Sequence, residues 1–202
     1  KKAIIRFVNE TTQHGSKQFI PPEERIAVFD NDGTLWSEQP LYVQLAFAID
    51  RIKTLAPQNP LWKTQQPFKA VLENDIQTIK TGGHKVLFEL IAATHAGMST
   101  EAFQAIVSDW LKTARHPVSN RPYTDMVYQP MIELLAYLRS NGYTNYIVSG
   151  GGTEFMRPWT QKAYGIPPER IIGSTIKSKF VEVSGQYRIV GLPELEWIND
   201  GP

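Results

Sequence analysis

Residues 26–35 read Ile-Ala-Val-Phe-Asp-Asn-Asp-Gly-Thr-Leu, an apolar run that leads directly into two aspartates. An unbroken apolar run of this length predicts a β-strand buried on both faces, as in a parallel sheet. Asp30 and Asp32 then lie at the carboxyl end of that strand, the edge at which open α/β sheets bind ligands. Residues two apart on an extended chain project to the same side. The two carboxylates are therefore expected to address one reacting centre.

Two carboxylates this close repel each other unless a cation or a shared proton compensates their charge. Magnesium, which prefers oxygen ligands, is the natural cation for this purpose. The same residues also suit a simple turn, because Asp, Asn and Gly are common in turns. An EF-hand calcium loop starting at Asp30 is excluded, since its sixth position would be Leu35 instead of Gly and its twelfth Leu41 instead of Glu. A magnesium site and a plain turn both remain open on these residues alone.

The pattern of an apolar strand followed by Asp-x-Asp-Gly-Thr-Leu resembles the first motif of the haloacid dehalogenase superfamily, in its phosphatase form. The resemblance implies that Asp30 is a nucleophile that becomes an aspartyl phosphate. It implies that Asp32 is a general acid and then a general base, and that both aspartates serve the Mg²⁺ cofactor. The second Asp also separates branches, because dehalogenases, phosphonate hydrolases and P-type pumps resemble the motif but do not carry Asp there.

A second candidate motif is Ser149-Gly150-Gly151-Gly152, which follows the apolar run 146–148 and precedes a predicted helix. This arrangement offers a hydroxyl and free backbone amides to a phosphate, although it also suits a tight strand-to-helix turn. Together with Asp30 it resembles the family's second motif, which implies that Ser149 and Gly150 bind phosphate. On adjacent parallel strands, Asp30, Asp32 and Ser149 are expected to share one cleft.

Residues 37–124 read as several helices without a convincing buried strand. A single β-α-β crossover needs far less chain, so this segment must form a small core of its own. We therefore predict an α/β fold with a three-layer, Rossmann-like parallel sheet, formed by residues 1–36 with 125–202, and an inserted all-helical cap formed by residues 37–124. The same order of parts is similar to the phosphoserine-phosphatase-like branch of the superfamily, whose cap also lies between the first two motifs.

Within these parts, one continuous helix is expected over residues 68–80. Ile171 and Ile172 are expected to form a short strand, and residues 180–183 and 187–190 a separate hairpin around Ser184 and Gly185.

Four further residues are candidates for the substrate pocket. Trp36 and Glu38 directly follow the aspartate loop and are placed to shape the pocket floor. Arg115 and Arg121 lie near the return of the cap to the core, where they could meet an anionic group of the substrate. A solvated charge cluster is the alternative interpretation of these two arginines.

The superfamily also uses a lysine as its third motif and a carboxylate cluster as its fourth. Lys177 is a candidate for the lysine, although it precedes the predicted hairpin where the similar branch has its lysine beyond it. Asp200 is followed only by Gly201 and Pro202, and no strand with Asp-x-x-x-Asp comes after it. We therefore expect a further C-terminal segment that carries a lysine and an aspartate pair.

Composition narrows the class of protein. The 202 residues suffice for one α/β core with an insert, and the net charge of +1 gives no electrostatic footprint for nucleic acid or an anionic membrane. No stretch approaches the roughly 18 apolar residues of a membrane span. Without cysteine, the chain has no thiolate nucleophile, disulfide framework or Cys-based zinc site. A soluble protein is expected, either cytoplasmic or exported after removal of a leader.

The sequence as a whole predicts a magnesium-dependent phosphomonoester hydrolase that acts on a small phosphorylated metabolite through an aspartyl phosphate. Phosphotransfer to a second alcohol would use the same groups. The alternative is an inactive relative, a module that keeps the phosphate pocket and binds phosphate or a partner. The absence of the third and fourth motifs favours this alternative. The oligomeric state is not predicted.

Overall fold

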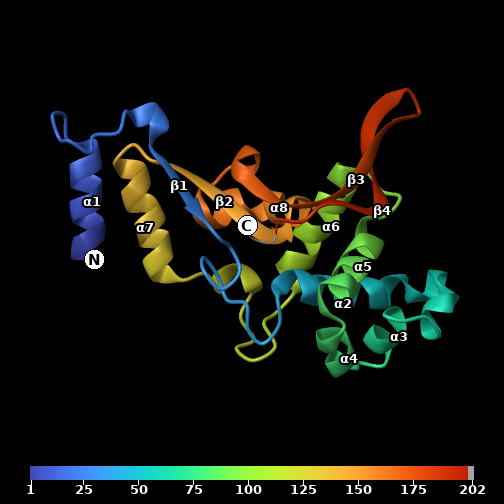
Figure 1. The fold of residues 1–202 in the computed structure, drawn as a ribbon. Helices are drawn as coiled ribbons and strands as arrows, with labels where there is room; N and C mark the ends of the chain where they lie inside the picture. Colours follow the sequence, from blue (N-terminus) through green and yellow to red (C-terminus); the bar gives the residue numbers. More distant parts are fainter. Residues whose placement is uncertain (200–202) are drawn as a thin grey trace.

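The computed structural model of the protein describes residues 1–199, apart from the side chains of His84 and Val183. Its sheet has four strands, in the order β1 (Ile26–Phe29), β2 (Thr144–Gly152), β3 (Ile171–Val183) and β4 (Gln186–Trp197). β1 and β3 each pair with β2 in parallel, whereas β4 is antiparallel to β3. The fold is therefore mixed α/β around a mostly parallel sheet, as the sequence predicted (Figure 1).

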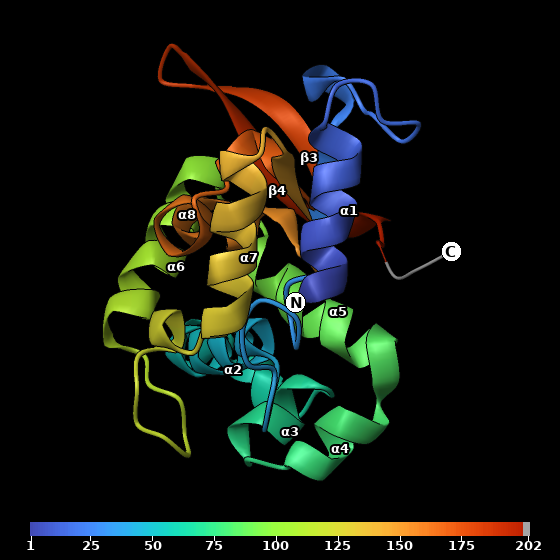
Figure 2. The same ribbon diagram turned by 90° about the vertical axis from the view of Figure 1, so that its left-hand side faces the viewer.

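The helices gather in groups around this sheet. They are α1 (Lys2–Thr12), α2 (Val43–Leu55), α3 (Phe68–Leu72), α4 (Ile76–Thr81), α5 (Gly83–His95), α6 (Thr100–Thr113), α7 (Gln129–Ser140) and α8 (Thr153–Tyr164). α1 lies beside α7 at one end of the sheet, and α2 to α5 cluster at the other (Figures 1 and 2). No helix within residues 1–199 is long and apolar enough to cross a lipid bilayer.

The inserted helices share one core with the sheet and have a second core of their own. Phe47 of α2 and Phe103 of α6 belong to the main core, where they pack with Phe155 of α8. The opposite side of α2 contributes to a smaller cluster among α2 to α5, which contains Leu45, Ile49, Ile52, Phe68, Ala70, Val71, Ile79 and Leu90. The helical segment thus forms the expected core, while α2 and α6 join it to the main one. A separately moving cap with the bounds 37–124 stays a prediction.

The prediction of a single helix over residues 68–80 is wrong, because the structure has two helices there, α3 and α4. Asn74 has φ +58°, a left-handed conformation that Asn adopts more easily than most residues and that a helix cannot continue through. Asp75 then caps α4 by accepting the backbone N–H of Thr78 at 3.0 Å. Local turn chemistry therefore overrides the apolar periodicity in this segment.

The short strand expected at Ile171 and Ile172 and the first arm of the expected hairpin, residues 180–183, are in fact one continuous strand, β3, while the second arm, residues 187–190, lies in β4. Its first residues pair with β2, with Ile171 opposite Ile147, and its later residues pair with β4. The predicted turn is present, with positive φ at both Ser184 and Gly185. The β3–β4 arm consequently extends away from the sheet (Figure 1).

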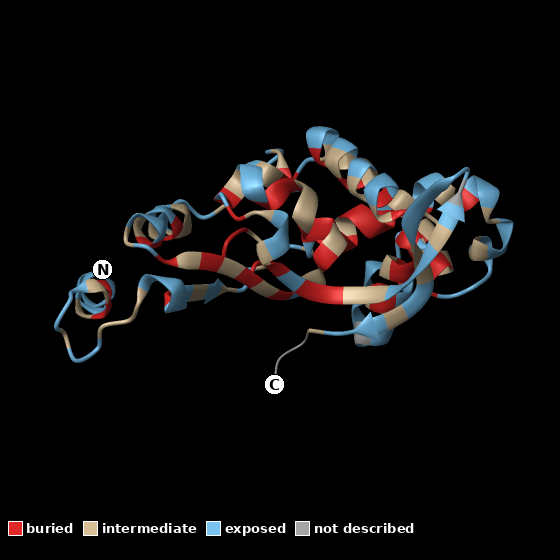
Figure 3. Ribbon diagram, turned by 90° about the horizontal axis from the view of Figure 1, so that it is seen from above, coloured by how far each residue is buried: buried red, intermediate tan, exposed pale blue. Residues whose placement is uncertain are grey.

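The expected burial of β1 on both faces is also wrong. Ala27 and Phe29 pack against the cluster formed by α1 and α7, but Ile26 and Val28 on the other face are 56% and 57% exposed (Figure 3). In the described part of the chain β1 is an edge strand that pairs with β2 alone. Helices within residues 1–199 cover only one face of this strand. Along its apolar run, packed residues therefore alternate with exposed ones.

Candidate active site

A cavity of about 220 Å³ opens at the carboxyl ends of β1 and β2. Its polar side is lined by Asp30, Asp32, Glu38, Ser149, Gly150 and Gly151. These residues come from two distant parts of the chain, and they meet because parallel neighbouring strands end at the same edge of a sheet. The structure therefore places Asp30, Asp32 and Ser149 in one cleft.

The loop after β1 is a tight turn that presents Asp30. Gly33 has φ +73° and donates its N–H to the carbonyl of Trp36 at 2.9 Å, which closes the turn. Asn31 is almost fully buried, and its Oδ1 accepts the hydroxyl of Tyr164 at 3.1 Å. The N–H of Asn31 in turn donates to Asp30 Oδ1 at 2.7 Å. Asp30 itself is exposed, so its second carboxylate oxygen can approach a substrate.

Asp32 is held from below by Trp36. The indole Nε1–H of Trp36 donates to Asp32 Oδ1 at 2.8 Å, and the fully buried ring stacks on Trp159 with the centroids 4.2 Å apart. The other oxygen, Oδ2, faces residues 149–152 at the carboxyl end of β2, which we name the glycine loop. It lies 3.5 Å from the position that a Cβ on Gly151 would occupy. One oxygen of Asp32 is thus fixed and the other is directed toward the cavity.

The electrostatic surroundings of Asp32 favour its protonated form. Burial raises the pKa of this carboxyl to about 6, and the negative charges of Asp30 and Glu38 add to the increase. The hydrogen bond from Trp36 favours the ionised form and offsets part of this effect. A carboxyl with a pKa near neutrality can both give and take a proton, as a general acid and base must.

The glycine loop does not follow the strand predicted over 146–148, because β2 continues through these residues to Gly152. Its carbonyl groups hold it in place. Ser174 Oγ donates to the carbonyl of Gly150 at 2.8 Å and accepts the N–H of Asn199 at 3.1 Å. Asn199 Nδ2 donates to the carbonyl of Ser149 at 3.0 Å. Ser149 Oγ accepts the N–H of Gly151 at 3.2 Å, so its own hydroxyl proton is directed elsewhere and can be offered to a ligand.

Trp36 and Glu38 both belong to the site, one beneath Asp32 and the other in the cavity wall. The structure does not bring the three basic candidates there. Lys177 lies on the exposed β3–β4 arm, where its ammonium is 2.7 Å from Glu194 Oε2, because β3 continues past the sheet.

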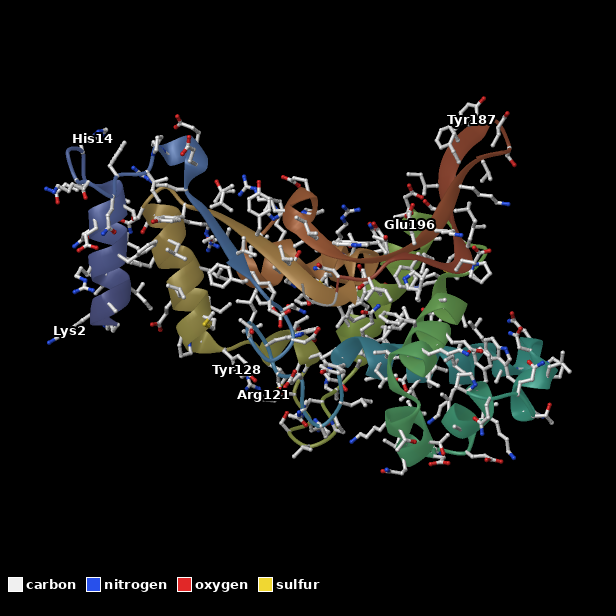
Figure 4. All side chains as sticks on the ribbon, in the orientation of Figure 1. Lys2, His14, Arg121, Tyr128, Tyr187 and Glu196 are labelled. Atoms are coloured by element: carbon white, nitrogen blue, oxygen red, sulfur yellow. The ribbon has the colours of Figure 1, made fainter. Side chains whose placement is uncertain are left out.

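The two arginine candidates lie in the loop that follows α6. Arg115 donates to the carbonyls of Lys112 and Ala114. Arg121, which is labelled in Figure 4, donates to the carbonyl of Asp125. Both guanidinium groups are used for local structure and neither lines the cavity. Asp200, after which the sequence shows no strand with Asp-x-x-x-Asp, lies outside the described residues.

Two residues of this region carry no sequence motif that would have revealed them. Gln44 of α2 lines the cavity, but a glutamine within an amphipathic helix has no distinctive pattern. Asn199 reaches the Ser149 loop because the chain after β4 returns to the sheet edge. That return depends on long-range pairing, which local periodicity does not encode.

The carboxylates of the cavity suit magnesium. Among residues 1–199, no group of three acidic or histidine side chains is arranged to hold a metal ion. Mg²⁺ needs only one or two protein carboxylates, since water and phosphate oxygens complete its coordination. The repulsion of Asp32 by Asp30 and Glu38 is also the kind of interaction that a cation relieves. The donor chemistry of Asp30 and Asp32 therefore fits this ion.

A family model for haloacid dehalogenase-like hydrolases matches residues 27–196. The chain belongs to this family. The match confirms the relationship inferred from the two motifs and includes both loops of the cavity. No curated protein sequence matches the chain significantly.

Solved structures share the fold at low sequence identity. A conserved protein of unknown function from Anaerococcus prevotii DSM 20548 aligns with a TM-score of 0.54 and 12% identity over 96% of this chain and 70% of its own. A protein of unknown function from Bordetella pertussis Tohama I aligns with a TM-score of 0.52 and 18% identity over 85% of this chain and 66% of its own.

A phosphoserine phosphohydrolase-like protein from Francisella tularensis subsp. tularensis SCHU S4 aligns less closely, with a TM-score of 0.41 and 15% identity over 85% of this chain and 64% of its own. The chain thus spans a little under two thirds of the length of the Bordetella and Francisella proteins. The likeness to the Anaerococcus and Bordetella structures concerns the fold alone.

Proposed function

We propose that this hydrolase cleaves small phosphate monoesters through an aspartyl phosphate on Asp30, with Mg²⁺ as its cofactor. The observation that carries the proposal is the meeting of Asp30, Asp32 and Ser149 in one cavity, with the pKa of Asp32 raised to about 6. Phosphoryl transfer depends mainly on alignment and charge stabilisation, and these groups supply a nucleophile, a proton carrier and hydrogen-bond donors.

In the first half of the reaction, a carboxylate oxygen of Asp30 attacks phosphorus. The bond from phosphorus to the leaving oxygen breaks, and Asp32 Oδ2 gives its proton to that oxygen, so that an alcohol departs. The raised pKa keeps a fraction of Asp32 protonated at neutral pH. Ser149 Oγ and the amide of Gly150 donate hydrogen bonds to the phosphoryl oxygens.

In the second half, Asp32 is a carboxylate and accepts a proton from a water molecule. The oxygen of this water attacks phosphorus, the bond to Asp30 breaks, and inorganic phosphate leaves. The Trp36 hydrogen bond keeps Asp32 Oδ2 directed toward the cavity in both steps. Asp30 and Asp32 would hold Mg²⁺, which would supply positive charge that offsets the repulsion of the phosphate by the carboxylates.

The test is the turnover of para-nitrophenyl phosphate by the whole protein in the presence of magnesium. Asp30→Asn keeps the size of the side chain but removes the nucleophilic oxygen, so we expect a loss of at least about 10³-fold in kcat. Asp125→Asn, in the loop outside the cavity, is the matched control and should retain turnover. Undiminished turnover in Asp30→Asn would rule out the mechanism. No turnover across a broad ester panel would favour the inactive phosphate-binding module.

A further inference from the structure

An aromatic row lies beneath the turn that carries the two aspartates. Trp36 stacks on Trp159 of α8, with the centroids 4.2 Å apart. Trp159 in turn meets Tyr164, the last residue of α8, edge to face, with the centroids 5.4 Å apart. All three side chains are at most 5% exposed, and none of them lines the main cavity. These three residues, which we name the aromatic row, can therefore act on the site only from below.

The aromatic row reaches the turn at two separate points. At one end, the indole N–H of Trp36 donates to Asp32 Oδ1 at 2.8 Å. At the other end, the hydroxyl of Tyr164 donates to Asn31 Oδ1 at 3.1 Å. Burial and the negative charge of Asp32 raise the pKa of the Tyr164 phenol, so it keeps its proton and remains a donor at neutral pH. Tyr164 thus holds the buried amide of Asn31, as Trp36 holds Asp32.

Asn31 passes the Tyr164 contact on to both aspartates. Its backbone N–H donates to Asp30 Oδ1 at 2.7 Å. Its side chain also hydrogen-bonds to Asp32, which favours the ionised form of that carboxyl. Since the hydroxyl of Tyr164 donates to the amide oxygen, the amide nitrogen is the end that faces Asp32. Without this hydroxyl, the buried amide could rotate, and the backbone N–H that holds Asp30 would lose its fixed position.

We propose that Tyr164 is a positioning residue that aligns the nucleophile Asp30 through Asn31. At the other end of the aromatic row, Trp36 aligns only the proton donor Asp32. Phosphoryl transfer depends mainly on alignment, so a side chain that never touches the substrate can still control the rate. This inference rests on the proposed phosphatase function and adds to it the residues that orient its two aspartates.

The first test is Tyr164→Phe, which removes the hydroxyl and keeps the ring. We expect kcat/KM of the whole protein for para-nitrophenyl phosphate to fall by about tenfold, because Asp30 is less well aligned. The inhibition constant of inorganic phosphate should change by less than about twofold, since Ser174 holds the glycine loop. Tyr143→Phe is the matched control, because its buried hydroxyl bonds to Thr11 on α1, away from the cavity. It should leave both values unchanged.

A double-mutant cycle separates positioning from a general effect on structure. In Asn31→Ala the amide is absent, so adding Tyr164→Phe should lower kcat/KM by no more than about a further twofold. If the hydroxyl acted only through the packing of α8, its removal would cause the same loss with and without Asn31. Asn31→Leu, which has a similar shape but no hydrogen-bonding group, takes the place of Asn31→Ala if the latter does not fold.

Trp36→Phe tests the other end of the aromatic row. Para-nitrophenolate leaves as a stable anion, whereas the alkoxide of propyl phosphate must receive a proton from Asp32. We expect the ratio of kcat/KM for para-nitrophenyl phosphate to that for propyl phosphate to rise by about tenfold in Trp36→Phe. Trp159→Phe is the matched control, because it alters the same stack but its indole N–H donates to the carbonyl of Phe155. It should keep the ratio within about twofold of wild type.

Each ratio is measured within one variant, so a general loss of activity cancels. An active wild type with undiminished kcat/KM in Tyr164→Phe, or with the same loss when Asn31 is replaced, would overturn the positioning role and leave the proposed function intact. An unchanged ratio in Trp36→Phe, or an equal rise in Trp159→Phe, would overturn the separate role of Trp36. A wild-type protein that turns over neither ester would refute the proposed function, and the role of the aromatic row with it.

Discussion

Asp32 is a buried acid whose ionisation opposes folding. Its pKa is raised to about 6 in the folded protein, so the native state binds this proton more tightly than the unfolded chain does. The stabilisation is therefore present at low pH and is lost as the pH rises from about 4 to above 6. In metal-free protein, we expect Asp32→Asn to gain up to about 2 kcal/mol of unfolding free energy relative to wild type between pH 4 and pH 7. Urea unfolding with a chelator measures this, and a difference that does not vary with pH would contradict it.

His95 on α5 should act in the opposite direction. Its ring is buried and stacked on Phe103 with the centroids 3.5 Å apart, and burial lowers the pKa of the imidazole to about 4. The unfolded chain then binds a proton that the folded protein excludes, so stability is full above about pH 6.5 and falls as the pH decreases. We expect wild type to lose about 2 kcal/mol from this group between pH 7 and pH 5.

The control for this second titration is His95→Leu, which cannot ionise. It should be less stable than wild type at pH 7, because the hydrogen bond to the carbonyl of Ile91 is lost, yet its stability should change less between pH 7 and pH 5. If both proteins lose the same free energy on acidification, His95 is not the source of the slope. The titrations of Asp32 and His95 change the stability of the native protein in opposite directions as the pH changes, so their effects partly cancel. Comparing Asp32→Asn and His95→Leu with wild type separates the two.

At the level of the secondary-structure elements, the conformation of the chain where β2 leads into α8 depends on Ser174 of β3. This hydroxyl donates to the carbonyl of Gly150 and accepts the N–H of Asn199. Ser174→Ala therefore removes one hydrogen-bond partner from the exposed Gly150 and one from the half-buried Asn199. We expect a loss of about 1–2 kcal/mol in stability and inhibition by inorganic phosphate that is weaker by several-fold, because the glycine loop is less ordered. Ser178→Ala, on the exposed arm of the same strand, is the matched control. Equal effects of the two changes would contradict a role for Ser174 in ordering the loop.

Local sequence patterns were sufficient to locate the site residues that lie at the carboxyl ends of β1 and β2. Asp30 was placed correctly directly after β1, and Ser149 was placed at the correct edge of the sheet, because apolar runs are local patterns and parallel pairing then brings the strand ends together. The end of β2 was placed too early, since the strand continues to Gly152. Lys177 was assigned to the phosphate and instead pairs with Glu194, because its place depends on how far β3 continues. Gln44 and Asn199 were not identified, since their contacts are made across the fold.

The whole molecule has one sheet face that its described helices leave uncovered. In the parallel register, Val28 is opposite Tyr146 and Val148 is opposite Ile172, so these side chains project from the same face as Ile26. Ile26, Val28 and Ile172 are 56%, 57% and 42% exposed. The sequence could not reveal this, because an apolar run has the same composition whether one or both of its faces are covered.

The two faces of the sheet should respond differently to the same substitution. Ile147 is fully buried in the main core, so Ile147→Thr in the 202-residue chain should cost at least about 2 kcal/mol in stability. Ile26→Thr on the opposite face should change stability by less than about 0.5 kcal/mol and reduce the binding of a hydrophobic dye. Denaturant unfolding and dye fluorescence measure the two effects. Equal costs for both substitutions would show that the Ile26 face is covered in solution.

The identity of the phosphorylated residue is the most direct test of the chemistry as a whole. Asp32→Asn lacks the base for the second half of the reaction, so it should accumulate the intermediate when mixed with magnesium and para-nitrophenyl phosphate and then quenched in acid. Mass spectrometry of the proteolysed protein is expected to find one phosphoryl group on the peptide that contains Asp30, and none when Asp30 is also replaced by Asn. A phosphoryl group on any other residue, or unlabelled protein during measurable turnover, would contradict nucleophilic catalysis by Asp30.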